Sequence, residues 1–186
     1  AYLKPGDALL YSRPVYGGTD HFINKVLPEY GIEVIPFSAS DSYDDLLRLT
    51  QGRPIRLIYA ETPANPTNAL IDLSMCTKLT QQLSTSDRPV HLAVDNTYMG
   101  PLWQHPLDHG ADLVLYSATK YIGGHSDLIA GAVSGSLDAM HPVRTLRTFL
   151  GNMASPWTSW MLMRSLETLK VRMDQQALNA ARVANY

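Results

Sequence analysis

Short apolar runs alternate with longer segments of helical pattern along the chain, and this alternation leaves few folds open. The apolar runs predict strands at Ala8–Tyr11, Glu33–Pro36, Arg56–Ala60, His91–Val94, Asp112–Tyr116 and Ile129–Ser134. The segments between them predict helices at His21–Leu27, Tyr43–Leu49, Ser74–Leu83 and Asp138–Leu150. A chain with this order is expected to form an α/β fold, with a mostly parallel sheet covered by helices on both faces.

A further helix is predicted near the C-terminal end. Ser155 and Pro156 suit an N-cap and a first helical position. Apolar residues then follow at helical spacing, namely Leu162, Leu166, Leu169 and Met173. No capping residue ends this pattern, and the chain starts at Ala1 without a methionine. We therefore expect one domain over residues 1–186, as part of a longer polypeptide.

Composition excludes several classes of partner. The chain is 45% hydrophobic and 17% charged, which suits a buried core. Fifteen Lys and Arg residues stand against 17 Asp and Glu residues, so the chain lacks the basic excess that nucleic acid binding requires. No apolar run is long enough to span a bilayer, so no membrane partner is expected. The single cysteine, Cys76, excludes an internal disulfide and favours a cytoplasmic protein.

Several common site motifs are missing. No Gly-x-Gly-x-x-Gly follows a strand, and there is no Walker A loop, no His-Glu-x-x-His and no Gly-x-Ser-x-Gly. His105 and His109 are four residues apart, but Pro106 lies between them and no third ligand is evident. We therefore expect no metal site.

Polar residues follow three of the predicted strands. Glu61, Asp95 and Ser117 each come directly after an apolar run. Ligands of parallel α/β sheets bind beyond the carboxyl ends of the strands, so these side chains are expected to meet at a pocket. Taken one at a time, each residue is more typical of a helix cap or a turn than of a binding site.

The segment that follows the fifth predicted strand carries most of the chemistry. Ser117, Thr119 and Lys120 lie in a turn of small residues, followed by Gly123 and Gly124. A lysine in a partly buried turn is costly to charge, so its neutral amine becomes available as a nucleophile. The two hydroxyls can donate hydrogen bonds to an anion such as a phosphate. The alternative is a surface lysine in a flexible, glycine-rich loop.

Asp95 supplies the second part of a candidate cofactor site. An acidic residue at the end of a buried strand can pair with a protonated pyridine nitrogen. A lysine that forms a Schiff base, together with such an acidic partner, is what a protein contributes to pyridoxal 5′-phosphate (PLP). Lys120 and Asp95 therefore predict a PLP site.

Several segments resemble the Cys/Met-metabolism family of PLP-dependent enzymes. The stretch from Asp112 to Ser126 is similar to the PLP-attachment signature of that family. Further similar stretches are Val-Tyr-Gly-Gly-Thr at 15–19, Glu-Thr-Pro-Ala-Asn-Pro-Thr at 61–67, Val-Asp-Asn-Thr at 94–97 and Ser165–Met173. The resemblance covers nearly the whole chain in the right order. It implies the large domain of an aspartate aminotransferase-like, type I fold, with the N-terminal segment and the C-terminal small domain absent.

The resemblance also implies a role for each site residue. Lys120 would hold PLP covalently and later move protons, and Asp95 would pair with the pyridine nitrogen. Ser117 and Thr119 would contact the cofactor phosphate. Tyr16 would stack on the ring and assist proton transfer, although the local sequence equally allows a half-buried tyrosine at a strand end. Asn65 would lie near the ring 3-hydroxyl, although the local sequence also allows a turn residue between two prolines.

The activity implied by the resemblance is γ-elimination or γ-replacement on a sulfur-containing or O-acylated homoserine-type amino acid, as in cystathionine γ-synthase and γ-lyase. A methionine γ-lyase is the alternative, although such enzymes usually carry a cysteine where this chain has Gly18, and a Lys-Asp pair in the stretch 148–152. The resemblance further implies a homodimer or homotetramer with shared sites. We expect residues 1–186 alone to be poorly active, because the phosphate loop and the substrate-binding arginine of the family lie outside them.

Two other classes stay open on the sequence. A nicotinamide-dependent oxidoreductase would share the α/β layout, but it requires a glycine-rich turn after a strand. A non-catalytic interaction domain would explain the sheet and the pocket without chemistry, and would leave Lys120 unmodified.

Overall fold

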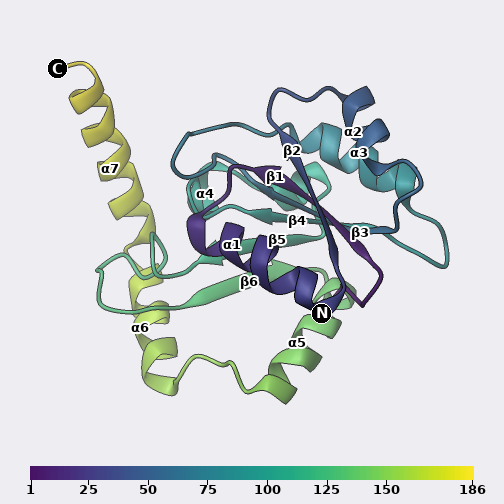
Figure 1. Ribbon diagram of the computed structural model, residues 1–186. Coiled ribbons are helices and arrows are strands. Elements are labelled where there is room, and N and C mark those ends of the chain that lie inside the picture. Colours follow the sequence, from purple (N-terminus) through teal and green to yellow (C-terminus); the bar gives the residue numbers. More distant parts are fainter.

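Residues 1–186 are described by a computed structural model, and six strands form one sheet at its centre (Figure 1). The strands are β1 (Ala8–Arg13), β2 (Glu33–Ser38), β3 (Ile55–Glu61), β4 (His91–Asp95), β5 (Leu113–Ser117) and β6 (Gly131–Gly135). Their order across the sheet is β2-β1-β3-β4-β5-β6. The first five run parallel, and β6 alone pairs antiparallel, with β5.

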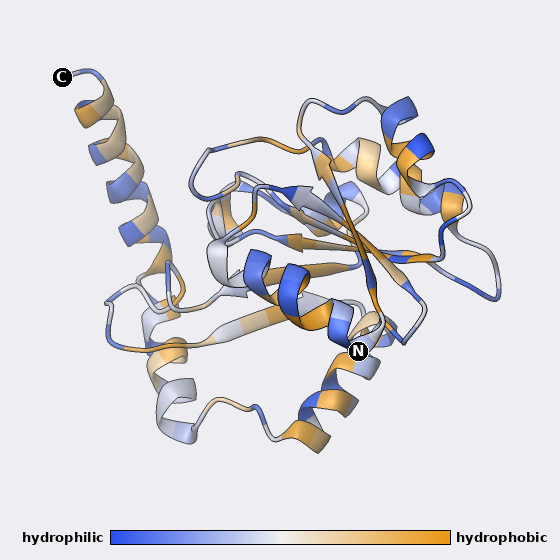
Figure 2. Ribbon diagram, viewed as in Figure 1, coloured by the Kyte–Doolittle hydropathy of each residue, from blue (hydrophilic) through white to orange (hydrophobic).

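The predicted strands are all present, within a few residues of their expected ends. β1 and β2 each end two residues later than predicted, and β6 begins at Gly131 rather than at Ile129, whose side chain is 91% exposed. β1 and β4 consist mainly of buried apolar residues because a parallel strand is covered on both of its faces, and in β3 the apolar residues Ile55, Ile58 and Ala60 are buried. Figure 2 shows this as hydrophobic colour concentrated on the strands of the sheet.

Helices and single helical turns connect the strands. They are α1 (Gly17–His21), a π-helical turn (Phe22–Val26), a 3₁₀ turn (Leu27–Tyr30), α2 (Tyr43–Thr50), α3 (Leu73–Leu83), α4 (Gly100–Trp103), a 3₁₀ turn (Pro106–His109), α5 (Leu137–Leu150), α6 (Pro156–Leu166) and α7 (Leu169–Ala184). The side chains of Ser42, Asp72, Ser136 and Ser155 accept hydrogen bonds from backbone amides at the starts of α2, α3, α5 and α6. Ser155 is therefore confirmed as an N-cap. None of these helices is long and apolar enough to cross a membrane.

Two apolar clusters show that both faces of the sheet are covered. Leu10 and Leu92 pack on one face with Leu46 of α2 and Leu79 of α3. The smaller cluster on the opposite face joins Leu9, Tyr11 and Val15 to Ile23 of the π-helical turn and to Ile32. Figure 1 shows α2 and α3 together on one side of the sheet and α1 on the other. The predicted mostly parallel sheet with helices on both faces is thus confirmed.

The prediction of one continuous helix from Pro156 past Met173 is wrong. The helix breaks at Glu167 and Thr168, where α6 ends and α7 begins. The break occurs where the Ser165 carbonyl accepts hydrogen bonds from the Thr168 amide (3.2 Å) and from the Arg172 guanidinium (2.8 Å). These two donors use the Ser165 carbonyl in place of the hydrogen bond from residue 169 that a continuous α-helix would make.

Leu92 offers a test of the packing that supports the sheet. Its side chain lies in β4, is fully buried and belongs to the larger apolar cluster. We expect Leu92→Ala to lower the free energy of unfolding by about 2–5 kcal/mol, because truncation leaves a cavity in a close-packed core. Chemical denaturation measures this loss, with Leu70→Ala as the control, since Leu70 is 68% exposed. Equal effects of both substitutions would contradict the assignment of Leu92 to the core.

Candidate active site

A cavity of about 550 Å³ opens where β3, β4 and β5 end. The residues that line it come from five separate parts of the chain: Tyr16, Glu61, Asn65, Asp95, Thr97, Tyr98, Ser117, Thr119, Lys120, Tyr121 and Ile129. All six candidate site residues from the sequence are among them. The structure therefore brings together residues up to about a hundred positions apart in one hollow, at the edge where ligands of parallel sheets bind.

The sheet register explains why the acidic residues meet. Glu61 is the last residue of β3 and pairs in register with Asp95, the last residue of β4. Ser117 ends the neighbouring strand β5. Because these strands are parallel and adjacent, their carboxyl ends lie at one edge of the sheet, as the sequence predicted.

Asp95 is held by hydrogen bonds to both of its carboxylate oxygens. Thr97 donates to Oδ1 through its hydroxyl (2.6 Å) and its backbone amide (3.0 Å). The Tyr59 hydroxyl donates to Oδ2 (3.1 Å). The Thr97 hydroxyl in turn accepts a hydrogen bond from the backbone amide of Ser117 (2.7 Å), which ties the ends of β4 and β5 together. The carboxylate therefore has a fixed orientation at the edge of the cavity.

Burial raises the pKa of the Tyr59 phenol well above its ordinary value, and the charge of Asp95 adds to the effect. The raised pKa favours the protonated phenol, which is the form that donates a hydrogen bond to Asp95. Sequence reasoning missed Tyr59 because it lies inside an apolar strand, where it reads as a core residue.

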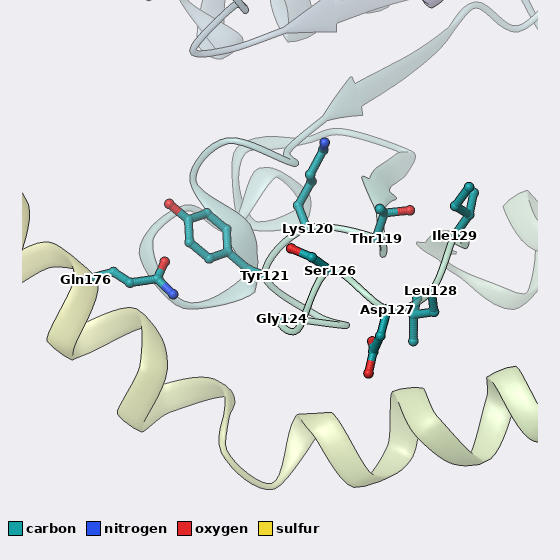
Figure 3. Close-up of a pocket in the computed structure, with 9 residues that line it drawn as sticks. All are labelled: Thr119, Lys120, Tyr121, Gly124, Ser126, Asp127, Leu128, Ile129 and Gln176. Atoms are coloured by element: carbon teal, nitrogen blue, oxygen red, sulfur yellow. The ribbon is translucent and has the colours of Figure 1, made fainter.

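Lys120 lies in the turn that follows β5. The backbone amide of Lys120 donates to the Ser117 carbonyl (3.0 Å), and the Gly124 amide donates to the Lys120 carbonyl (2.7 Å). Figure 3 shows the adjoining hollow, in which the side chains of Lys120 and Asp127 leave the turn in opposite directions. The expectation of a partly buried lysine is wrong for this chain, because Lys120 is exposed at the mouth of the hollow.

The two candidate hydroxyls differ in their freedom to bind a ligand. The Ser117 side chain has no hydrogen-bond partner within the protein and lines the cavity. The Thr119 hydroxyl accepts a hydrogen bond from the Ala130 amide (3.0 Å) and donates a longer one to the Ala130 carbonyl (3.3 Å). Ser117 is therefore ready to donate to an anion, whereas Thr119 must first release the Ala130 carbonyl.

Glu61 braces two of the candidate residues. One carboxylate oxygen accepts a hydrogen bond from the backbone amide of Tyr16 (2.7 Å), and the other accepts one from the amide of Asn65 (2.8 Å). Burial raises the pKa of the Glu61 carboxyl, while these two amides act to lower it. The sequence placed Glu61 at a strand end but did not select it as a site residue, because its two partners lie on different loops. Glu61 therefore fixes where Tyr16 and Asn65 enter the cavity.

Replacement of Glu61 by glutamine should release one of these loops. Glutamine keeps the size of the side chain but offers one oxygen in place of two, so one of the two amides loses its acceptor. We expect the amide of Tyr16 or of Asn65 to exchange its hydrogen about tenfold faster or more, since a hydrogen bond to a charged group contributes that order of stabilisation. Hydrogen exchange measures this change. Glu29→Gln is the control, because Glu29 is exposed and outside the cavity, and an unchanged exchange rate in Glu61→Gln would contradict the brace.

The histidines do not form a metal centre in this structure. No group of three His, Cys, Asp or Glu side chains has the geometry to hold a metal ion. His105 contacts the Pro101 carbonyl through Nε2 (3.1 Å), and His109 is exposed at the end of a 3₁₀ turn.

Comparisons with known proteins agree on one family. The family described as Cys/Met metabolism PLP-dependent enzyme matches residues 1–186. Human cystathionine γ-lyase is 37% identical over 185 residues, which are 99% of this chain and 44% of the relative. Cystathionine γ-synthase of Mycobacterium leprae is 38% identical over 185 residues, again 99% of this chain and 46% of the relative. The chain therefore spans about half the length of the relatives it matches.

A solved structure confirms the likeness of the fold. Cystathionine γ-lyase from Lactobacillus plantarum, crystallised with L-serine, superposes with a TM-score of 0.87 at 34% identity. The match covers 99% of this chain and 47% of that structure.

The groups around the cavity fit the cofactor of this family. An amine for a covalent bond (Lys120), a carboxylate for a pyridine nitrogen (Asp95) and a free hydroxyl for a phosphate oxygen (Ser117) all line it. The side chain of Tyr16 is 55% exposed there, so its flat face is available to a ring. The sequence match over every residue, the fold and these side chains together show that the chain belongs to the Cys/Met metabolism family of PLP-dependent enzymes.

Proposed function

We propose that the protein containing this chain catalyses γ-elimination or γ-replacement on a γ-substituted amino acid, with cystathionine or an O-acylated homoserine as the class of substrate. The observation that carries this proposal is the single cavity that gathers Lys120, Asp95, Ser117, Thr119, Tyr16 and Asn65. The names of two similar relatives, cystathionine γ-lyase and cystathionine γ-synthase, support the same class.

Each residue has a defined task in this proposal. Lys120 holds PLP covalently and, once free, accepts the proton of the substrate α-carbon. Asp95 accepts a hydrogen bond from the pyridine nitrogen and keeps it protonated. Ser117 and Thr119 donate to the phosphate, Tyr16 covers the ring, and Asn65 contacts its 3-hydroxyl. When bound, PLP supplies the electron-accepting ring that stabilises negative charge at the α-carbon.

Reductive trapping tests the proposal directly. The intact protein is mixed with PLP and treated with borohydride, and the added mass is located by peptide mass spectrometry. We expect one pyridoxyl group, on Lys120. Label spread over several lysines, or no label, would refute the cofactor site and revive a non-catalytic role.

A substrate panel then separates elimination from replacement. Release of a 2-oxo acid and ammonia from cystathionine would identify a γ-lyase, whereas formation of cystathionine from an O-acylated homoserine and cysteine would identify a γ-synthase. Fastest turnover with methionine would instead support the methionine γ-lyase alternative, which Gly18 disfavours.

Three broader expectations stay predictions. The family resemblance predicts a homodimer or homotetramer, which light scattering of the intact protein would test. The single cysteine, Cys76, favours a cytoplasmic protein. The assignment of residues 1–186 to part of a PLP-binding large domain predicts that this piece turns over substrate far more slowly than the intact protein.

A further inference from the structure

The turn that carries Lys120 is tied to the start of α7 by one side chain, Arg172. Its Nη1 donates to the backbone carbonyl of Tyr121 (2.7 Å), the residue after Lys120. Its Nη2 donates to the Ser165 carbonyl (2.8 Å), and its Nε donates to the Thr168 hydroxyl (3.0 Å). One guanidinium thus joins the lysine turn to the junction between α6 and α7.

The turn is shaped to receive this guanidinium. Gly124 has a φ of +73°, which favours glycine, and a Cβ at this position would lie 2.0 Å from Nη1 of Arg172. The guanidinium therefore occupies the space in which any other residue would place its side chain. A planar group with several fixed donors suits a task in which three acceptors must be held at once.

Apart from those of Arg172, the hydrogen bonds of this turn stay within it or join it to Ala130, except for one long contact of 3.5 Å between the Ser165 hydroxyl and Nδ1 of His125. The Lys120 amide bonds to Ser117, the Gly124 amide bonds to Lys120, and the Gly123 amide bonds to Ala118 (2.7 Å). Edge-to-face contact of Tyr121 with Trp103 adds a further neighbour. Arg172 makes the hydrogen bond that joins the residue next to Lys120 directly to α7.

We propose that Arg172 is a positioning residue for Lys120, holding the lysine turn against the α6–α7 junction so that the amine faces the cavity. This inference rests on the proposed function, since it assigns Arg172 a role in the covalent capture of PLP. Arg172 is outside the cavity and acts through the Tyr121 carbonyl. Its removal should therefore slow covalent capture without weakening noncovalent binding of the cofactor.

Two measurements on the intact protein separate these effects. The first is the rate at which PLP becomes trapped on Lys120. The second is the affinity for pyridoxamine phosphate, which shares the ring and the phosphate but has no aldehyde to react with lysine. We expect Arg172→Met to slow trapping about tenfold or more, because it removes a hydrogen bond from a charged donor, and to change the affinity for pyridoxamine phosphate by less than about twofold.

Matched variants complete the test. Arg182→Met, on the same helix, should trap PLP at the parent rate, because Arg182 is exposed and makes no side-chain hydrogen bond. Arg172→Lys keeps the charge but cannot reach three acceptors, so its trapping rate should lie between those of the parent and of Arg172→Met. It is measured in place of Arg172→Met if that variant does not fold.

Trapping by the Arg172 variants within about twofold of the parent rate would overturn the inference, since a lost charged hydrogen bond has a larger effect than this. An equal loss of trapping rate and of pyridoxamine phosphate affinity would overturn it too, by showing a general structural role. Failure of the proposed function is distinct, because the parent protein itself would then trap no PLP on Lys120.

Discussion

Replacement of Lys120 by alanine is expected to abolish the pyridoxyl label at position 120 and to reduce turnover of the intact protein by about 10²- to 10⁴-fold. Lys120 is the one lysine that lines the cavity at the strand ends. Its removal takes away both the amine that captures the cofactor and the base that moves the α-proton. Peptide mass spectrometry after borohydride reduction measures the first loss, and steady-state kinetics measures the second.

Two control variants make this experiment specific. Lys120→Arg keeps the positive charge but replaces a nucleophilic amine with a guanidinium, so it should be as inactive as Lys120→Ala. Lys78→Ala removes an exposed lysine of α3 that stacks on the ring of Tyr43, away from the cavity, and should keep the label and the turnover. If the parent protein carried as much pyridoxyl label on Lys78 as on Lys120, the site would not be specific.

The six strands could be predicted from the sequence because the apolar pattern of each strand lies within the strand itself. In the run at 91–94, for example, the three consecutive residues Leu92, Ala93 and Val94 are apolar and buried, which is the pattern of a strand inside a parallel sheet covered on both faces. The break between α6 and α7 could not be predicted, because local spacing favours an uninterrupted helix. It coincides with the contacts of Arg172 with Ser165 and with Tyr121, and Tyr121 lies 51 residues earlier in the chain.

The same distinction applies to the site. Lys120 and Asp95 could be found because each follows a buried strand directly and carries reactive chemistry. Glu61 and Tyr59 act through partners on other segments, since Glu61 binds an amide 45 residues away and Tyr59 binds a carboxylate 36 residues away. No spacing rule connects such pairs until the sheet register is known. The exposure of Lys120 was likewise beyond local reasoning, because the turn is rich in small residues that suggest burial.

Asp95→Asn is expected to reduce turnover by about 10- to 1000-fold, because an adjacent carboxylate typically shifts the pKa of a basic nitrogen by 1–3 units and asparagine has no charge. The substitution keeps the shape of the side chain and one acceptor oxygen. Covalent capture on Lys120 should persist, since that amine is untouched. The absorbance of the bound cofactor, followed against pH, should show the ring nitrogen losing its proton at lower pH than in the parent.

Tyr59→Phe separates the charge of Asp95 from its orientation. The phenylalanine removes the hydrogen bond to Oδ2 but leaves the carboxylate charged and still held at Oδ1 by Thr97. If the charge of Asp95 is what matters, Tyr59→Phe should reduce turnover much less than Asp95→Asn does. The expected reduction is about tenfold or less, which is the order of one charged hydrogen bond. Asp87→Asn, in an exposed loop away from the cavity, should behave as the parent. If Asp95→Asn left both the turnover and the pH profile of the bound cofactor unchanged, the ring nitrogen would not face Asp95, and the orientation of PLP in this cavity would have to be reversed.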